Sequence, residues 1–234
     1  MNLLTVIVVV YLLIETLLGG KRGFFKSIVA LLVIGAAMFF SMRCSPQVAK
    51  AIKDNTDIDE LLEERIEEGL ELPKSQNEMG SRSWQKEQLD NSGFPDCIKR
   101  ILEDNSNQEF FRALGAESFC HYIAGYITGI ILNSIAYLLT FVGIWLLFHI
   151  MARALGLVFE LPILNGLNRV GGALFGLAKG ILVLLLFFVI LTMFGSNQWG
   201  QTVIQAVEES PVLFWLYENN PLMDVVTDIT KLIF

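Results

Sequence analysis

The sequence predicts an all-α membrane protein with four transmembrane helices in two hairpins. Hydrophobic residues make up 53% of the 234 residues, and the mean hydropathy is +0.54. One soluble core does not need so apolar a composition. Four segments reach or approach the roughly 20 apolar residues with which an α-helix crosses a bilayer core of roughly 30 Å. The remainder is acidic and polar, which predicts a loop and a tail outside the membrane.

The four spans differ in how well the sequence defines their ends. They are expected over Leu3–Leu18, Phe24–Met42, part of Phe119–Met151, and Val170–Phe194. The third segment is longer than one crossing requires, so a tilt, a bend near Gly143 or a continuation along the interface stays open. Bases follow the first apolar stretch instead of preceding it, so we expect an anchor and not a cleavable signal peptide. Residues 1–42 and 119–195 are thus the two transmembrane hairpins.

The turn between the first two spans is basic and rich in glycine. Residues 19–26 read GGKRGFFK, which holds three bases and no acid. Short basic loops stay in the cytoplasm, and glycine adopts the positive φ values that a tight reversal needs. We therefore interpret this stretch as a cytoplasmic hairpin turn; its topology and turn residues are Gly19, Gly20, Lys21, Arg22 and Gly23.

The other charges are sorted in the same way. Arg153, Arg169 and Lys179 flank the second short connection against the single acid Glu160. Residues 43–118 carry ten bases and seventeen acids, and residues 196–234 carry one base and five acids. Placing both basic connections inside puts both termini and the long loop outside, which four spans allow.

The acidic loop, residues 43–118, is expected to be partly helical. Between Thr56 and Leu72 apolar residues recur at helical spacing, with Asp57 and Glu60 placed to cap the start. The apolar positions are Ile58, Leu61, Leu62, Ile66 and Leu70. Packing within the loop and binding of a protein partner both stay open for this helix. Residues 73–95 are polar and predict a flexible connection, and residues 96–116 predict one further short helix.

The tail, residues 196–234, predicts short amphipathic helices that begin at Ser210-Pro211 and Asn220-Pro221. One face of the last helix would contact the membrane or the helix bundle; it comprises Leu222, Val225, Val226, Ile229, Leu232 and Ile233. The aromatic residues Trp199, Trp215 and Tyr217 suit a membrane interface.

Two ionisable residues and three glycines stand out inside the spans. Glu15 and Lys179 are expected near the cytoplasmic ends of their helices, either as snorkelling side chains or as an intramembrane ion pair. Gly172, Gly176 and Gly180 recur every four residues and form a groove for close helix packing. Internal packing is the preferred interpretation of this groove, with self-association as the alternative.

No pattern in the sequence predicts catalysis, a cofactor or a metal. His121 and His149 lack the companions of a protease, zinc or thiol-enzyme site, so we interpret both as structural. Cys44, Cys97 and Cys120 would lie outside or near the outer face, where two of them can pair. Which two is not deducible from the sequence.

Two stretches carry a resemblance to a known family. LLGGKRGFFKSIVALL holds the glycine and basic turn, and LPILNGLNRVGGALFGLAKG leads into the fourth span. Together with ESPVLFWLYENNPL in the tail, they resemble the colicin V production protein family, CvpA, whose members are small bacterial membrane proteins with four predicted spans. Members often carry an aspartate near the start of the first span, where this chain has Asn2 and Thr5.

The resemblance implies a role in bacteriocin production or export and in the cell envelope of bacteria. We expect a non-enzymatic protein of the plasma membrane whose partners are the lipid bilayer and other proteins, not nucleic acid. A homo-oligomer stays open. The alternatives are a small transporter or channel subunit and a membrane anchor for a separate extracytoplasmic enzyme.

Overall fold

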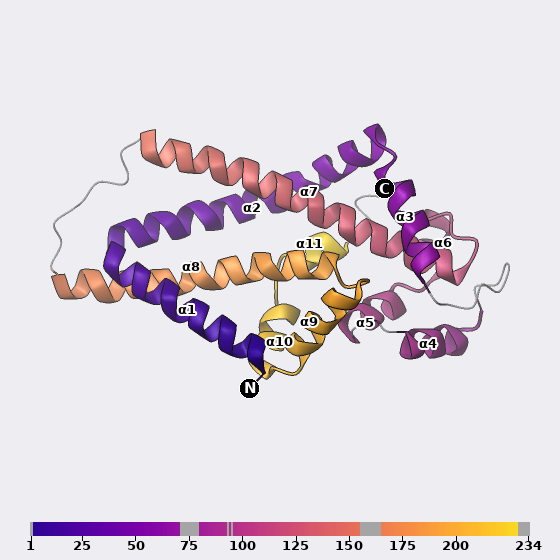
Figure 1. The fold of residues 1–234 in the computed structure, drawn as a ribbon. Coiled ribbons are helices and arrows are strands. Elements are labelled where there is room, and N and C mark those ends of the chain that lie inside the picture. Colours follow the sequence, from indigo (N-terminus) through magenta and orange to yellow (C-terminus); the bar gives the residue numbers. More distant parts are fainter. Residues whose placement is uncertain (1, 71–79, 93, 95, 155–164, 229–234) are drawn as a thin grey trace. The chain divides into compact units, whose positions relative to one another are not determined.

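The described residues of the computed structural model are 2–70, 80–92, 94, 96–154 and 165–228. They form eleven α-helices and no strand (Figure 1). The helices are α1 Leu3–Arg22, α2 Phe24–Asn55, α3 Ile58–Gly69, α4 Arg82–Asn91, α5 Asp96–Asp104, α6 Gln108–Ala113, α7 Phe119–Ala154, α8 Asn165–Met193, α9 Gln198–Glu208, α10 Pro211–Glu218 and α11 Met223–Thr227. Within these residues, α1, α2, α7 and α8 are long and apolar enough to cross a membrane. The predicted all-α class with four spans is confirmed.

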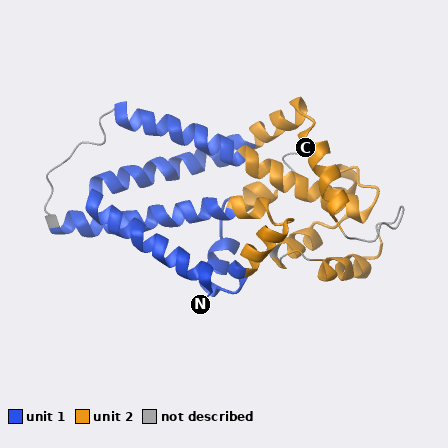
Figure 2. Ribbon diagram, viewed as in Figure 1, with its two compact units in different colours: residues 1–45, 137–188, 206–222 blue, residues 46–136, 189–205, 223–234 orange. Residues whose placement is uncertain are grey.

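The chain divides into two compact units, coloured separately in Figure 2. Unit 1 comprises residues 1–45, 137–188 and 206–222, and unit 2 comprises residues 46–136, 189–205 and 223–234. The division within α2 falls at Pro46, whose ring removes one backbone N–H from the helix. Each unit therefore combines segments that are distant in the sequence.

Unit 1 contains most of the apolar surface. Among the described residues, all but five of the large exposed hydrophobic side chains belong to it. The five exceptions are Ile58, Leu61, Ile190, Phe194 and Trp199. A soluble protein rarely exposes an apolar surface of this extent, so unit 1 is the part that the bilayer covers. Inside it, Phe24 packs edge-on against Phe175 of α8, and Phe40 packs edge-on against Phe148 of α7.

Helix α7 is apolar along its whole length but differs between its halves. Its first half, to Ala136, belongs to unit 2 and is almost entirely buried, whereas Leu139, Leu146 and Ile150 in the second half are exposed. The sequence predicted a segment longer than one crossing, with a tilt or a bend as alternatives. The structure shows one uninterrupted helix, and protein covers its first half.

The core of unit 2 gathers around the first half of α7. Tyr122 is fully buried; its hydroxyl donates to Leu102 O of α5 at 2.9 Å, and its ring packs edge-on against Phe111. A second cluster joins α2 to α7 through Ala49, Leu132 and Ala136. The acidic loop is therefore built into a helical unit with its own buried residues.

Residues 73–95, predicted as a flexible connection, contain helix α4, so that prediction is wrong for residues 82–91. Ser81 caps α4 by accepting from Trp84 N, the ring of Trp84 packs against Phe119, and Leu89 is buried. Phe119 is distant from α4 in the sequence, which is why the polar composition did not predict the helix. Residues 71–79, 93 and 95 lie outside the described part.

Residues 96–116 form two helices, α5 and α6, in place of the single one predicted. Asn107 ends the connection between them, and its side chain accepts from the backbone N–H groups of Glu109 and Phe110. Asparagine is a favoured N-cap because its side-chain oxygen satisfies a free N–H of the first turn. The Asn107 cap starts a second helix within a stretch whose composition alone predicts a single helix.

Helix α3 begins where the sequence predicts, with Asp57 at the N-cap position but without a side-chain capping hydrogen bond. In the tail, α10 begins at Pro211 as expected, whereas α11 begins two residues after Pro221. Helix α9 was not predicted. Of the expected apolar face of the last helix, Ile229, Leu232 and Ile233 lie outside the described residues.

The predicted interfacial aromatic residues separate into two groups. Trp199 and Trp215 are exposed, whereas Tyr217 is buried, with its ring edge-on against Phe188 at 5.4 Å. Placing Tyr217 at a membrane interface is therefore wrong.

Candidate functional site

The predicted glycine groove is a contact between the backbones of α8 and α1. A Cβ added at Gly176 would overlap Glu15 O and lie 2.9 Å from Gly19 Cα, and one added at Gly172 would overlap Gly19 O. At Gly180 an added Cβ would lie 3.1 Å from Leu12 Cδ2. Without side chains on this face of α8, the first and fourth spans come as close as their backbones allow.

The basic hairpin turn is shorter than the sequence predicts. Gly19, Gly20, Lys21 and Arg22 belong to the last turn of α1, and Gly23 alone, at φ 85°, makes the break before α2. The prediction that Gly19 and Gly20 belong to the turn is wrong, because both residues lie in α1 and Gly19 packs against α8. Glycine serves a tight turn and a close helix contact equally well, so composition did not separate the two roles.

Asn168 is a turn residue that the sequence reasoning missed. Its Oδ1 accepts a hydrogen bond from Phe24 N at 2.6 Å, and an added Cβ at Gly23 would lie within 3.0 Å of Asn168 Oδ1. The side chain therefore satisfies a free N–H at the start of α2, as a cap would, from a residue far away in the sequence. In the sequence, Asn168 lies in the stretch NGLNRVGG, shortly before the glycines that contact α1 and α2.

The two ionisable residues of the spans meet next to the glycine contact. Lys179 Nζ lies 2.6 Å from Glu15 Oε2, and the two side chains are 14% and 15% exposed. Lys179 is the middle residue of α8, so its expected place near a helix end is wrong. A lysine there cannot snorkel easily to the end of its helix, and a carboxylate partner offsets part of the cost of its charge.

An apolar groove runs between α2 and α8 on unit 1. Its volume is about 760 Å³. It is lined by Leu31, Leu32, Gly35, Ala36, Phe39, Phe40, Ala178, Ile181 and Leu182. Every one of these side chains is apolar, so the groove suits hydrocarbon and not an ion.

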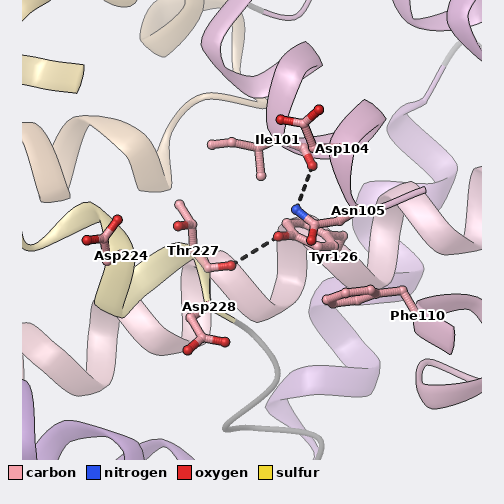
Figure 3. A pocket seen from close by; sticks show the side chains of 8 residues that line it. All are labelled: Ile101, Asp104, Asn105, Phe110, Tyr126, Asp224, Thr227 and Asp228. Carbon is pink, nitrogen blue, oxygen red and sulfur yellow. Dashed lines mark hydrogen bonds between the residues drawn. The ribbon is translucent and has the colours of Figure 1, made fainter. Parts of the chain in front are cut away.

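Unit 2 contains a polar pocket of about 390 Å³, shown in Figure 3. It is lined by Ile101, Asp104, Asn105, Phe110, Tyr126, Asp224, Thr227 and Asp228. Tyr126 Oη donates to Thr227 O at 3.1 Å and ties the end of α11 to α7. Three carboxylates beside two aromatic rings favour a positively charged group over an anion.

His121 joins α7 to the acidic helix α3. Its Nε2 lies 2.9 Å from Glu63 Oε1, and burial raises the pKa of that carboxyl, which Glu67 and Asp59 raise further. The lack of a side chain at Gly125 makes room for the Glu63 carboxyl, because an added Cβ would lie 3.0 Å from the same oxygen. His149 stacks on Trp145. Both histidines thus make structural contacts.

The described residues contain no group of three or more His, Cys, Asp or Glu side chains placed to hold a metal ion. Cys44 is a half-buried free thiol, and Cys120 is buried at the start of α7. Cys44 and Cys120 are not bonded to each other, and the side chain of Cys97 lies outside what the structure describes.

The fold and the paired charges in its long helices define an all-α, multi-pass membrane protein. Residues 111–221 match the family model described as Colicin V production protein. Of the stretches that carried the resemblance, the approach to α8 lies inside the match, and GGKRGFFK lies outside it. No curated protein and no solved structure matched the chain.

Proposed function

We propose that this protein supports the production or export of a colicin V type bacteriocin, and the maintenance of the envelope, as a non-enzymatic protein of the bacterial inner membrane. It acts through protein partners outside the membrane. The family match over residues 111–221 supports the bacteriocin role. The observation that carries the supporting role is the closed pair of Glu15 and Lys179, because a transport path needs ionisable groups that face a cavity.

The contacts around this pair suit packing. Glu15 and Lys179 lie between α1 and α8 directly beside Gly176 and Gly180. The groove described on unit 1 is apolar throughout. In a supporting protein each charge of the pair only neutralises the other, and loss of both charges together leaves no unpaired charge in the bilayer.

The proposed orientation places both short connections in the cytoplasm and both termini outside. Lys21 and Arg22 end α1, and a Cβ added at Gly20 would lie 3.4 Å from Arg169 O. The bases of the two connections therefore gather at one end of unit 1. Such clustering is what retention on the cytoplasmic side requires.

The outer face of α3 is the proposed docking surface for a partner. Ile58 and Leu61 are exposed there, whereas Leu62 packs against the cluster of Ala49, Leu132 and Ala136. Acidic residues flank this face, so anionic lipid would repel it and a protein with basic groups would suit it.

A double exchange and a surface exchange test the proposal in a bacteriocin-producing strain that lacks the chromosomal copy. Glu15→Gln with Lys179→Met should leave secreted bacteriocin unchanged, whereas Ile58→Ser with Leu61→Ser should reduce it at equal membrane abundance. If the double exchange abolishes secretion in a stably inserted protein, and the purified wild type moves protons or a solute in liposomes, the role is transport.

A further inference from the structure

The segment that follows α9 belongs by its contacts to the unit that the bilayer covers. Residues 206–222 fall in unit 1, although they come after the fourth span in the sequence. They contain α10, whose run from Pro211 to Tyr217 carries no charge. An ordinary tail outside the membrane would not need so apolar a helix.

Contacts with α8 place the end of this segment well along the fourth span. Asn220 Nδ2 donates to Leu185 O at 3.0 Å, and Tyr217 packs against Phe188. Leu185 lies eight residues before the end of α8 at Met193. With a rise of 1.5 Å per residue, that is about 12 Å along the helix axis.

The start of the segment lies at the outer end of the first span. The side-chain amide of Asn2, the N-cap of α1, donates to Ala206 O and lies 3.3 Å from Glu209 Oε2. The chain therefore enters beside the first residue of α1 and reaches α8 beside Leu185, with α10 between the two contacts (Figure 1).

The backbone of α10 meets the demand that hydrocarbon makes on a polypeptide, which is that its polar groups are bonded within the protein. Phe214 N donates to Ser210 O at 2.8 Å, and Asn219 N donates to Trp215 O at 3.0 Å. Pro211 opens the helix without an N–H, and Asn220 Oδ1 accepts from Leu222 N. The C-terminal end is thus satisfied within the protein, whereas the N-cap residue Ser210 makes no side-chain hydrogen bond to the first turn.

The two faces of α10 differ in the way that a half-inserted helix requires. Leu213 and Tyr217 face the protein and are buried, whereas Val212 and Trp215 are 67% and 62% exposed. Leu3, next to the residue at which the segment begins, is also exposed. Acyl chains that cover an apolar span such as α1 also suit Val212 and Trp215.

We propose that α10 is a re-entrant helix that dips into one leaflet beside α1 and α8, with the face of Val212 and Trp215 against lipid acyl chains. The helix contributes a fifth membrane contact without crossing the bilayer. The proposal rests on the contacts of unit 1 alone and does not depend on the role in bacteriocin production.

Depth-dependent fluorescence quenching in liposomes tests the proposal on the full chain. In a variant that keeps only Trp215, with Phe at the other three tryptophans, lipids brominated on their acyl chains should quench the emission and aqueous iodide should not. The variant that keeps only Trp145, in the membrane half of α7, is the positive control. The one that keeps only Trp84, in α4, is the aqueous control. Quenching of Trp215 by iodide as strong as that of Trp84, with none by brominated lipid, would overturn the proposal.

Cysteine labelling gives a second readout that needs no tryptophan exchange. After the native cysteines are changed to serine, Val212→Cys should react with a membrane-soluble maleimide but not with a charged one. Ser83→Cys, at an exposed position of α4, should react with both. Equal reaction of both cysteines with the charged reagent contradicts the re-entrant helix.

Discussion

At the scale of single residues, glycines determine how the first and fourth spans meet. Gly19 and Gly176 face each other so closely that even one methyl group on either would overlap backbone of the opposite helix. Backbone cannot move aside as the end of a flexible side chain can, so the overlap has to separate the helices. The separation would also pull Glu15 away from Lys179.

This geometry predicts that Gly176→Ala destabilises the protein, although alanine has the higher helix propensity. Overpacking of this kind costs about 1–3 kcal/mol, which for a chain of this size lowers Tm by roughly 2–10 °C. Thermal unfolding in detergent, followed by circular dichroism, measures the change. Gly166→Ala is the matched control on the same helix, because an added Cβ there meets nothing within 4 Å. Equal Tm values for the two variants would show that the contact carries no stability.

The sequence predicted some of these residues and not others, for physical reasons. The spacing of Gly172, Gly176 and Gly180 identified the groove, because four residues return to nearly the same helix face. It did not identify the partner, since no local signal links Gly19 to a helix at the other end of the chain. Asn168 was missed for the same reason: it caps α2 across the fold.

At the scale of helices, the two faces of amphipathic α3 differ: one packs against the protein and the other is exposed. Leu62 packs against the cluster of Ala49, Leu132 and Ala136, whereas the neighbouring Leu61 is 60% exposed. The contact between His121 Nε2 and Glu63 Oε1 adds a second link from α3 to α7. The inner face thus attaches the helix, and the outer face stays accessible.

We expect Leu62→Ala to loosen α3 and Leu61→Ala to leave its attachment unchanged. A half-buried leucine contributes about 1–2 kcal/mol, so amide hydrogen exchange in α3 should accelerate about 5- to 30-fold. Exchange measured by mass spectrometry on the reconstituted protein reports this directly. Faster exchange in both variants, or in neither, would contradict the assignment of the two faces.

The long helices were predictable, because a soluble protein does not need apolar segments of that length. The short helices were not predictable from composition. Helix α4 is polar and depends on contacts across unit 2, such as Ser106 Oγ donating to Gln85 Oε1 at 2.6 Å. The division of α7 was equally hidden. Its buried first half and its exposed second half are similarly apolar in sequence. Only the packing of unit 2 distinguishes the half that contacts protein from the half that suits lipid.

At the scale of the whole molecule, the proposed orientation follows from charge sorted along the chain. Accessibility of single cysteines, introduced after removal of the native ones, measures it in intact cells. Ser83→Cys in α4 and Thr202→Cys in α9 should react with an impermeant maleimide, and Gly166→Cys should react only after the membrane is opened. All three positions are exposed on the protein. Labelling of Gly166→Cys alone in intact cells would reverse the orientation.

The pairing of Glu15 with Lys179 also has a consequence for biogenesis. The acid is in the first of the four long helices of the described chain to be synthesised, and its lysine is in the last of them. At about 5–20 residues per second, the interval between them is on the order of ten seconds. During that time the acid has no lysine partner within the membrane, where an unpaired charge is costly. A product truncated before α8 would lack that partner permanently, so the pair forms only when the fourth span is in place.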